Sequence, residues 1–114
     1  MRDKGRDKER LNHIIESVGN IFEFTAKISL EEFSANKMLR FAVIKNLEII
    51  GEASNLLSDE LKDKYPEIDW KSIIGLRNFL VHGYYQISDK IIWNSIQEDL
   101  PRFLSQITSI KNGL

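Results

Sequence analysis

Apolar residues recur at intervals of three and four along most of this 114-residue chain, which is the spacing of amphipathic helices. Between about Lys8 and Ile28 this spacing predicts a first helix with one buried stripe. No segment alternates with period two over a useful length, so the pattern predicts no strand. The stripe of the first helix consists of Leu11, Ile14, Ile15, Val18, Ile21, Phe22 and Thr25.

A second helix is predicted from Ser29 to about Leu57. Ser29 and Glu32 have the spacing of a capping box, in which two side chains satisfy amides at the start of a helix. Two neighbouring apolar seams predict burial against more than one neighbour. Residues 51–54 form either a small-residue surface for close helix approach or a segment with a tolerated glycine. The seams are Val43, Leu47, Ile50, Ser54 and Leu57, and beside them Ala42, Ile49, Ala53 and Leu56.

A short helical turn and a third helix are expected next. Ser58, with Asp59 and Glu60 behind it, can cap the short turn, and Pro66 ends it because proline lacks an amide donor. Asp69 is the predicted cap of the third helix, which Gly83 ends. The inner positions of this helix are Trp70, Ile73, Ile74, Phe79, Leu80 and Val81.

The last predicted helix begins after a cap at Ser88 or Asp89, and Pro101 is expected to kink it or to begin a new helix. Taken together, the elements predict an all-α fold, an up-and-down bundle of four main helices plus a short helical turn. The length fits a single domain over residues 1–114. The apolar positions of the last helix are Ile92, Ile96, Leu100, Phe103, Ile107 and Ile110.

Charge and composition limit the classes of function. There are 16 basic and 17 acidic residues, so an RNA site would have to be local or assembled from two subunits. The chain has no cysteine, and its two histidines are His13 and His82, so we expect no metal and no cofactor. The segment from Met1 to Arg10 alternates in charge and does not resemble a signal peptide. No segment approaches the ~20 apolar residues of a membrane span, so the cytoplasm is the expected location.

The candidate chemistry lies in the run Gly75-Leu76-Arg77-Asn78-Phe79-Leu80-Val81-His82-Gly83-Tyr84-Tyr85. Arginine suits phosphate oxygens, and histidine gains and loses a proton near neutral pH. On an ideal helix Asn78 and His82 share a face, whereas Arg77 and His82 diverge by about 140°. Either Gly83 lets His82 turn toward Arg77, or a second subunit supplies the missing half of the site.

This motif resembles the signature of the HEPN superfamily, and specifically its HepT-like toxin branch. The flanks 46–53 and 70–78 are similar as well, as is the Asp99-Leu100-Pro101 step, so the resemblance spans roughly Ile14 to Ile110. It implies a helical bundle that forms a homodimer, and a metal-independent endoribonuclease that acts as the toxin of a type II toxin–antitoxin system.

The resemblance also implies roles for the motif residues. Arg77, Asn78 and His82 are the expected catalytic residues. Tyr84 is the expected acceptor of AMP from a minimal nucleotidyltransferase antitoxin, although the neighbouring Tyr85 is a second possible acceptor. RNA, that antitoxin and a second copy of the chain are the expected partners, and no membrane is expected.

Other readings remain open at the level of sequence. Arg77 and His82 could serve only the end of a helix, and the protein could be a non-catalytic subunit that binds a nucleotide or a nucleotidyltransferase. His13 is expected to be structural or exposed. Trp70 and Trp93 are expected in the core or an interface. Three basic residues are expected on a solvated face of the second helix: Lys37, Arg40 and Lys45.

Overall fold

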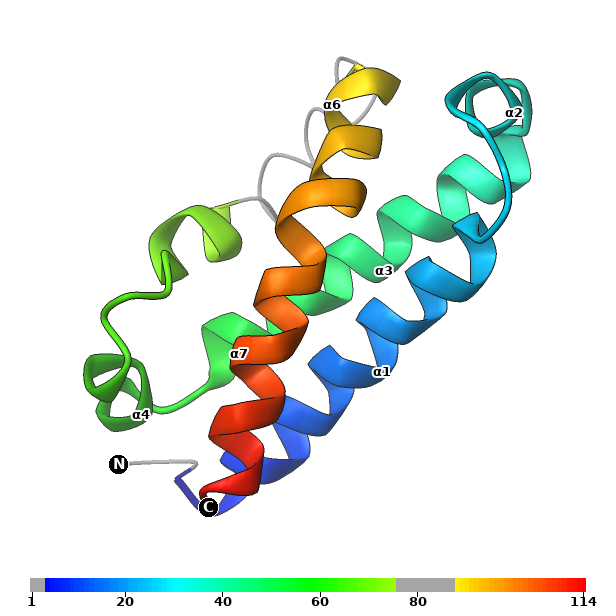
Figure 1. Ribbon diagram of the computed structural model, residues 1–114. Helices are drawn as coiled ribbons and strands as arrows, with labels where there is room; N and C mark the ends of the chain where they lie inside the picture. Colours follow the sequence, from blue (N-terminus) through cyan, green and yellow to red (C-terminus); the bar gives the residue numbers. More distant parts are fainter. Residues whose placement is uncertain (1–3, 76–87) are drawn as a thin grey trace.

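The computed structural model describes residues 4–75 and 88–114, and each element assigned within them is helical (Figure 1). The all-α bundle predicted from the sequence is confirmed. Before the gap the elements are η1 at Lys4–Arg6, α1 at Asp7–Thr25, α2 at Leu30–Ala35, α3 at Lys37–Leu56 and α4 at Asp59–Lys64, followed by helical residues 70–75. After it come α6 at Asp89–Asn94, a π-helical turn, η3, at Ser95–Asp99, and α7 at Leu100–Asn112.

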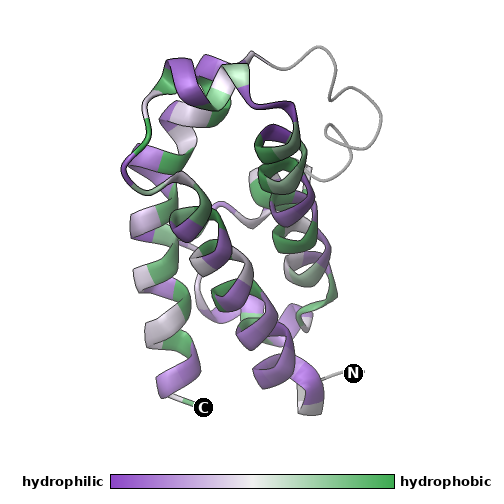
Figure 2. Ribbon diagram, turned by 90° about the vertical axis from the view of Figure 1, so that its right-hand side faces the viewer, coloured by the Kyte–Doolittle hydropathy of each residue, from purple (hydrophilic) through white to green (hydrophobic). Residues whose placement is uncertain are grey.

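The three longest described helices, α1, α3 and α7, pack around one apolar core. The predicted stripe of the first helix and the first predicted seam of the second helix both reach this core, since Ile14 and Val18 of α1 and Val43 of α3 are fully buried. Figure 2 shows apolar residues mainly along the inner sides of the helices and hydrophilic residues outside. The second predicted seam of α3 is buried only in part, because Ile49 remains 37% exposed. Part of the apolar surface of α3 therefore has no neighbour within the described part of this chain.

A buried amide also joins α1 to α3. Asn46 is 8% exposed, and its Oδ1 accepts a hydrogen bond from Asn20 Nδ2 at 3.2 Å. Its own Nδ2 donates to the Ala42 carbonyl at 2.9 Å. Burying an amide is costly unless its groups are bonded, and both ends of this one are.

The second predicted helix is wrong as a single element, because it is broken at Asn36. The predicted capping box at Ser29 is present, with Glu32 N donating to Ser29 Oγ at 3.1 Å and Ser29 N to Glu32 Oε1 at 2.8 Å. Asn36 has the non-helical angles φ −107° and ψ 95°, and its Oδ1 accepts a bond from Leu39 N at 3.0 Å. Its side chain thereby caps a new helix, and asparagine favours this position over a helix interior.

The predicted cap at Ser58 is confirmed and has a partner that sequence reasoning missed. Leu61 N donates to Ser58 Oγ at 3.2 Å at the start of α4. Asp7, in the mixed-charge segment at the start of the chain, is only 4% exposed. Its Oδ1 accepts from Ser58 N at 2.8 Å and its Oδ2 from Ser58 Oγ at 2.6 Å. The Asp7 carboxylate, in the first turn of α1, therefore holds the α3–α4 connection in place through its bonds to Ser58.

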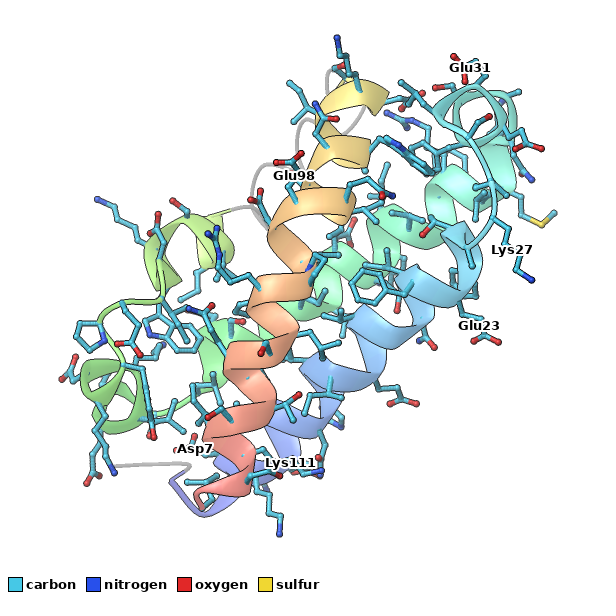
Figure 3. All side chains as sticks on the ribbon, in the orientation of Figure 1. Asp7, Glu23, Lys27, Glu31, Glu98 and Lys111 are labelled. Carbon is cyan, nitrogen blue, oxygen red and sulfur yellow. The ribbon has the colours of Figure 1, made fainter. Side chains whose placement is uncertain are left out.

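The last predicted helix is helical throughout but changes type midway. The π-helical turn η3 separates α6 from α7, and Pro101 stands in the first turn of α7, where a missing amide costs least. The expectation that Pro101 begins a new helix is therefore confirmed. In Figure 3 Asp7 and Lys111 lie at the same end of the bundle, so α1 begins and α7 ends at that end.

Candidate functional site

The predicted site residues Arg77, Asn78, His82 and Tyr84 lie outside the described residues, as does Tyr85. Their catalytic and acceptor roles therefore stay predictions. The structure does describe the two chain segments that flank this motif. Arg77 follows the helical residues 70–75 by two positions, and Tyr84 precedes α6 by five.

The upstream flank is held by a helix cap and a buried tryptophan. Asp69 accepts from Ser72 N at 3.1 Å and from Ser72 Oγ at 2.7 Å, which confirms the predicted cap. The bond from the Ser72 hydroxyl, followed by that from its amide, lowers the pKa of Asp69 from its ordinary value. Trp70 donates from Nε1 to the Tyr65 carbonyl at 3.1 Å and meets Phe103 edge-on, with ring centroids 6.5 Å apart. Trp70 is thus a core residue, as predicted.

The downstream flank is held to the corner between α2 and α3. Ser88 caps α6 by accepting a bond from Lys90 N at 3.1 Å. Next to it, Asp89 Oδ1 accepts a bond from Arg40 Nε of α3 in an ion pair. One turn further, Trp93 packs on Phe33 of α2 with ring centroids 5.5 Å apart. Both flanks are therefore held against the core, the upstream one by Trp70 and the downstream one by Trp93.

The ion pair corrects the reading of the basic residues on the second predicted helix. Arg40 does not belong to a solvated face, because only 18% of its side chain is exposed. Lys45 does belong to such a face, with 70% of its side chain exposed, and Lys37 is exposed as well. No local signal marked Arg40, since its partner lies 49 residues further along the chain.

A pocket of about 640 Å³ lies next to the upstream flank, between residues 67–73, α3, η3 and α7. Apolar side chains such as Ile73 and Phe103 line it together with polar ones. Among the charged residues that line it, three are acidic and one is basic, so the described walls do not favour a phosphate. These charged residues are Glu67, Asp69, Asp99 and Arg102.

A second groove, of about 390 Å³, lies between α1 and α3. Arg10 lines it and donates from Nη1 to the Leu56 carbonyl at 3.1 Å. His13 lines the groove and is exposed, which agrees with the expectation that it is structural or exposed. Basic and acidic residues line this groove together, so the groove offers no cluster of cations for RNA. The remaining charged residues of this groove are Lys45, Glu48 and Glu52.

Two further observations concern metal ions and membranes. Among residues 4–75 and 88–114, no group of three or more histidine, aspartate or glutamate side chains is arranged to hold a metal ion. No helix in the described part of the chain combines the length and the apolar character needed to cross a bilayer.

Comparison with known proteins gives the family. Residues 14–110 match the family described as "Ribonuclease HepT-like". A Methanocaldococcus jannaschii protein named "Putative RNase MJ1380" is 42% identical over 100 residues, which cover 88% of this chain and 92% of that protein. The "Probable ribonuclease HepT" of Thermococcus cleftensis is 35% identical over 108 residues, covering 95% of this chain and 98% of the relative. No solved structure matches the chain.

The matched region includes both flanks and the whole motif between them, and the fold is the helical bundle expected for it. The chain belongs to the HepT-like ribonuclease family, as the motif and its flanks predicted.

Proposed function

We propose that this protein is a metal-independent endoribonuclease and the toxin of a type II toxin–antitoxin pair. The observation that carries the proposal is the intact Arg77, Asn78, His82 and Tyr84 motif in a chain of the HepT-like ribonuclease family. Two relatives of nearly equal length are named as ribonucleases, which supports RNA as the substrate. The proposed toxin role goes beyond ribonuclease activity, which is all that the names of these relatives state.

The chemistry follows from the residue types. Cleavage without a metal requires the ribose 2′-hydroxyl to lose its proton and attack the phosphorus, while the departing 5′-oxygen gains a proton. His82 can transfer these protons, and Arg77 can stabilise the additional charge on the phosphorane with two parallel hydrogen bonds. Asn78 would orient His82 or the phosphate. One histidine in one protonation state cannot be both base and acid, so two copies of the chain would supply the pair.

The outer face of α3 supports a homodimer. Met38 is 82% exposed, Phe41 47% and Ile49 37%, and their spacing of three and eight residues puts them on one side of the helix. Lys45 and Glu52 lie on the same side, so an antiparallel copy of α3 would place opposite charges across the contact. Ile49 belongs to the second predicted seam, whereas Met38 and Phe41 lie outside both seams, and together the three residues form exposed apolar surface on α3.

Regulation is proposed to act through Tyr84. A nucleotidyltransferase antitoxin would transfer AMP from ATP to the phenol oxygen, forming an O–P bond and releasing pyrophosphate. The new phosphate would lie two residues from His82 in sequence and could pair with Arg77, which would then be lost to RNA. The volume of the attached AMP and its negative charge would both oppose the binding of RNA.

The decisive test of catalysis uses RNA with a fluorescent label and the purified protein in excess EDTA. We expect cleavage by the wild type and by His13→Ala, because His13 is exposed and away from the motif in sequence. We expect no cleavage by His82→Ala or Arg77→Ala. Cleavage that stops in EDTA and returns with magnesium or manganese would contradict the metal-free mechanism.

The test of regulation is the intact mass of the protein after co-expression with a nucleotidyltransferase encoded beside it. Wild type and Tyr85→Phe should gain the mass of one AMP unit, and Tyr84→Phe should gain none. A gain that persists in Tyr84→Phe and vanishes in Tyr85→Phe would identify Tyr85 as the acceptor instead.

A non-catalytic binding role is the second candidate, and the near-balanced charge favours it. The chain has 16 basic and 17 acidic residues, and among the described residues the α1–α3 groove and the pocket beside residues 67–73 both have mixed charge rather than the basic lining common in RNA-binding proteins. A wild-type protein that binds the nucleotidyltransferase but cleaves no RNA would establish this alternative.

A further inference from the structure

Met38 is the most exposed large apolar side chain in the described part of the chain, at 82% exposure. It is the second residue of α3. A single exposed apolar residue is common on protein surfaces and by itself indicates no contact. Met38 becomes informative because a partly apolar groove lies toward the other end of the same helix.

That groove is the one of about 390 Å³ between α1 and α3. Three of its lining residues are apolar, and its volume is at the lower end of the range of pockets for small molecules. At about 100° per residue, all three lie within about 60° of Met38 around the axis of α3. Met38 and the groove therefore belong to one face of the helix. The three apolar lining residues are Ile49, Ala53 and Leu56.

Met38 cannot reach the groove of its own chain. It lies 18 residues before Leu56 in a continuous helix, which separates the two by about 27 Å along the axis. An antiparallel second copy brings the first turn of one α3 opposite the last turn of the other. Two-fold symmetry then forms the same contact twice, since each copy has both the side chain and the groove.

The charges in the middle of this face favour one register. Lys45 and Glu48 have side chains 70% and 25% exposed and form an ion pair of 3.9 Å within the chain. Such an exposed pair contributes little, so exchanging it for a pair between copies costs little. If Lys45 lies opposite Glu48 of the second copy, Met38 lies opposite Asn55, because each is seven residues further out. Asn55 is next to Leu56, which lines the groove.

We propose that the α1–α3 groove binds Met38 of a second copy of this chain. The proposal rests on the homodimer proposed above and names the side chain and the groove that fit together in it. The flexible thioether side chain suits a groove of irregular shape, and its burial removes apolar surface from water. Each dimer would contain two such contacts.

Disulfide cross-linking tests the register. The chain has no cysteine, so each single-cysteine variant carries one thiol. We expect a mixture of Met38→Cys and Asn55→Cys to form a cross-linked pair on oxidation, because facing positions bring the two Cα atoms within about 7 Å. Met38→Cys mixed with Ser105→Cys, an exposed position on α7, should form none. Equal yields in the two mixtures would overturn the register.

A complementation experiment tests the contact itself, with dissociation constants measured by analytical ultracentrifugation. Met38→Ala removes the side chain and keeps the groove, whereas His13→Trp fills the groove and keeps Met38. Each variant alone loses both contacts, so its dissociation constant should rise about hundredfold, at about tenfold for each contact. The mixed dimer keeps one contact and should be about tenfold tighter than the dimer of either variant alone.

The matched control is Ile91→Ala, which removes an apolar side chain that is 64% exposed on α6 and should leave the dissociation constant unchanged. Circular dichroism checks that the variants fold, as expected from the exposure of Met38 and His13. A monomeric wild type would overturn the homodimer on which the proposal rests. A dimeric wild type whose affinity Met38→Ala leaves unchanged, or a mixed dimer no tighter than either variant dimer, would overturn the groove contact alone.

Discussion

Removal of the Asp7 carboxylate tests the attachment between the start of α1 and the α3–α4 connection. In Asp7→Ala, the Ser58 amide loses its acceptor at 2.8 Å and the Ser58 hydroxyl loses its acceptor at 2.6 Å. Both residues are nearly buried, Asp7 at 4% exposure and Ser58 at 8%, so water does not readily replace the carboxylate. The variant therefore leaves a buried amide unsatisfied.

The magnitude follows from these contacts. Hydrogen bonds to a charged group stabilise a fold by about 1.5–3 kcal/mol, and an unsatisfied buried donor costs about 1–3 kcal/mol. Because the two effects overlap, we expect the free energy of unfolding to fall by about 2–4 kcal/mol. For a domain of this size, that corresponds to a melting temperature lower by about 8–16 °C.

The assay is urea unfolding followed by circular dichroism, with Glu9→Ala as the control. Glu9 shares the first turn of α1 with Asp7 but is exposed, so both variants lose the same interaction with the helix dipole. Only Asp7→Ala also loses the bonds to Ser58. Equal destabilisation in the two variants would refute the reasoning, because it would assign the whole effect of Asp7 to the dipole.

Three further predictions use other parts of the structure. The pKa of Asp69, measured by NMR, should lie below that of an ordinary aspartate and should rise in Ser72→Ala. Because this pKa is lowered in the folded state, the stabilisation from the cap is fully present at pH values above the ordinary aspartate pKa, and it is lost as the pH falls through the lowered pKa of Asp69. A normal pKa for Asp69 would contradict the cap. Phe33→Ala should destabilise the protein by about 3–5 kcal/mol in urea unfolding, since the ring is fully buried against Trp93; a loss below about 1 kcal/mol would show that the α2–α6 contact is not part of the cooperative core. Light scattering at tens of micromolar, a choice set by typical association strengths, should give a dimer for the wild type and a monomer for Phe41→Glu; a monomeric wild type would exclude the proposed α3 contact.

Features set by short sequence spacings were predictable. The capping box at Ser29 and the cap at Ser58 depend on residues three positions apart, so the local sequence contains both partners of each bond. The buried stripe of α1 follows from helical periodicity in the same way. The break at Asn36 was not found, because the apolar spacing continues across it and a single capping side chain outweighs that continuity.

Long-range polar contacts were not predictable from one sequence. Asp7 and Ser58 lie 51 residues apart, and Arg40 and Asp89 lie 49 apart. Charged residues at such distances look like ordinary surface residues until the fold brings them together. The candidate site was found differently, since the Arg77 to Tyr84 motif was recognised through its resemblance to a family and the chain does belong to that family.

The π-helical turn η3 has a consequence for how this chain tolerates insertions and deletions. A π-helical turn contains one residue more than an α-helical turn, so it is equivalent to a single-residue insertion in a continuous helix. The buried residues Ile92, Ile96 and Leu100 recur every four positions across it, and after it the spacing of Phe103 and Ile107 is that of an ordinary helix. Deleting one residue from 95–99 would convert the π-helical turn into an α-helical turn and leave α7 in nearly the same rotation relative to α6, because the wider turn accommodates its extra residue without the rotation of about 100° that a residue adds in an α-helix. A deletion at this turn should therefore keep the buried faces of α6 and α7 in place, whereas a deletion within either α-helix would turn one buried face away from the core.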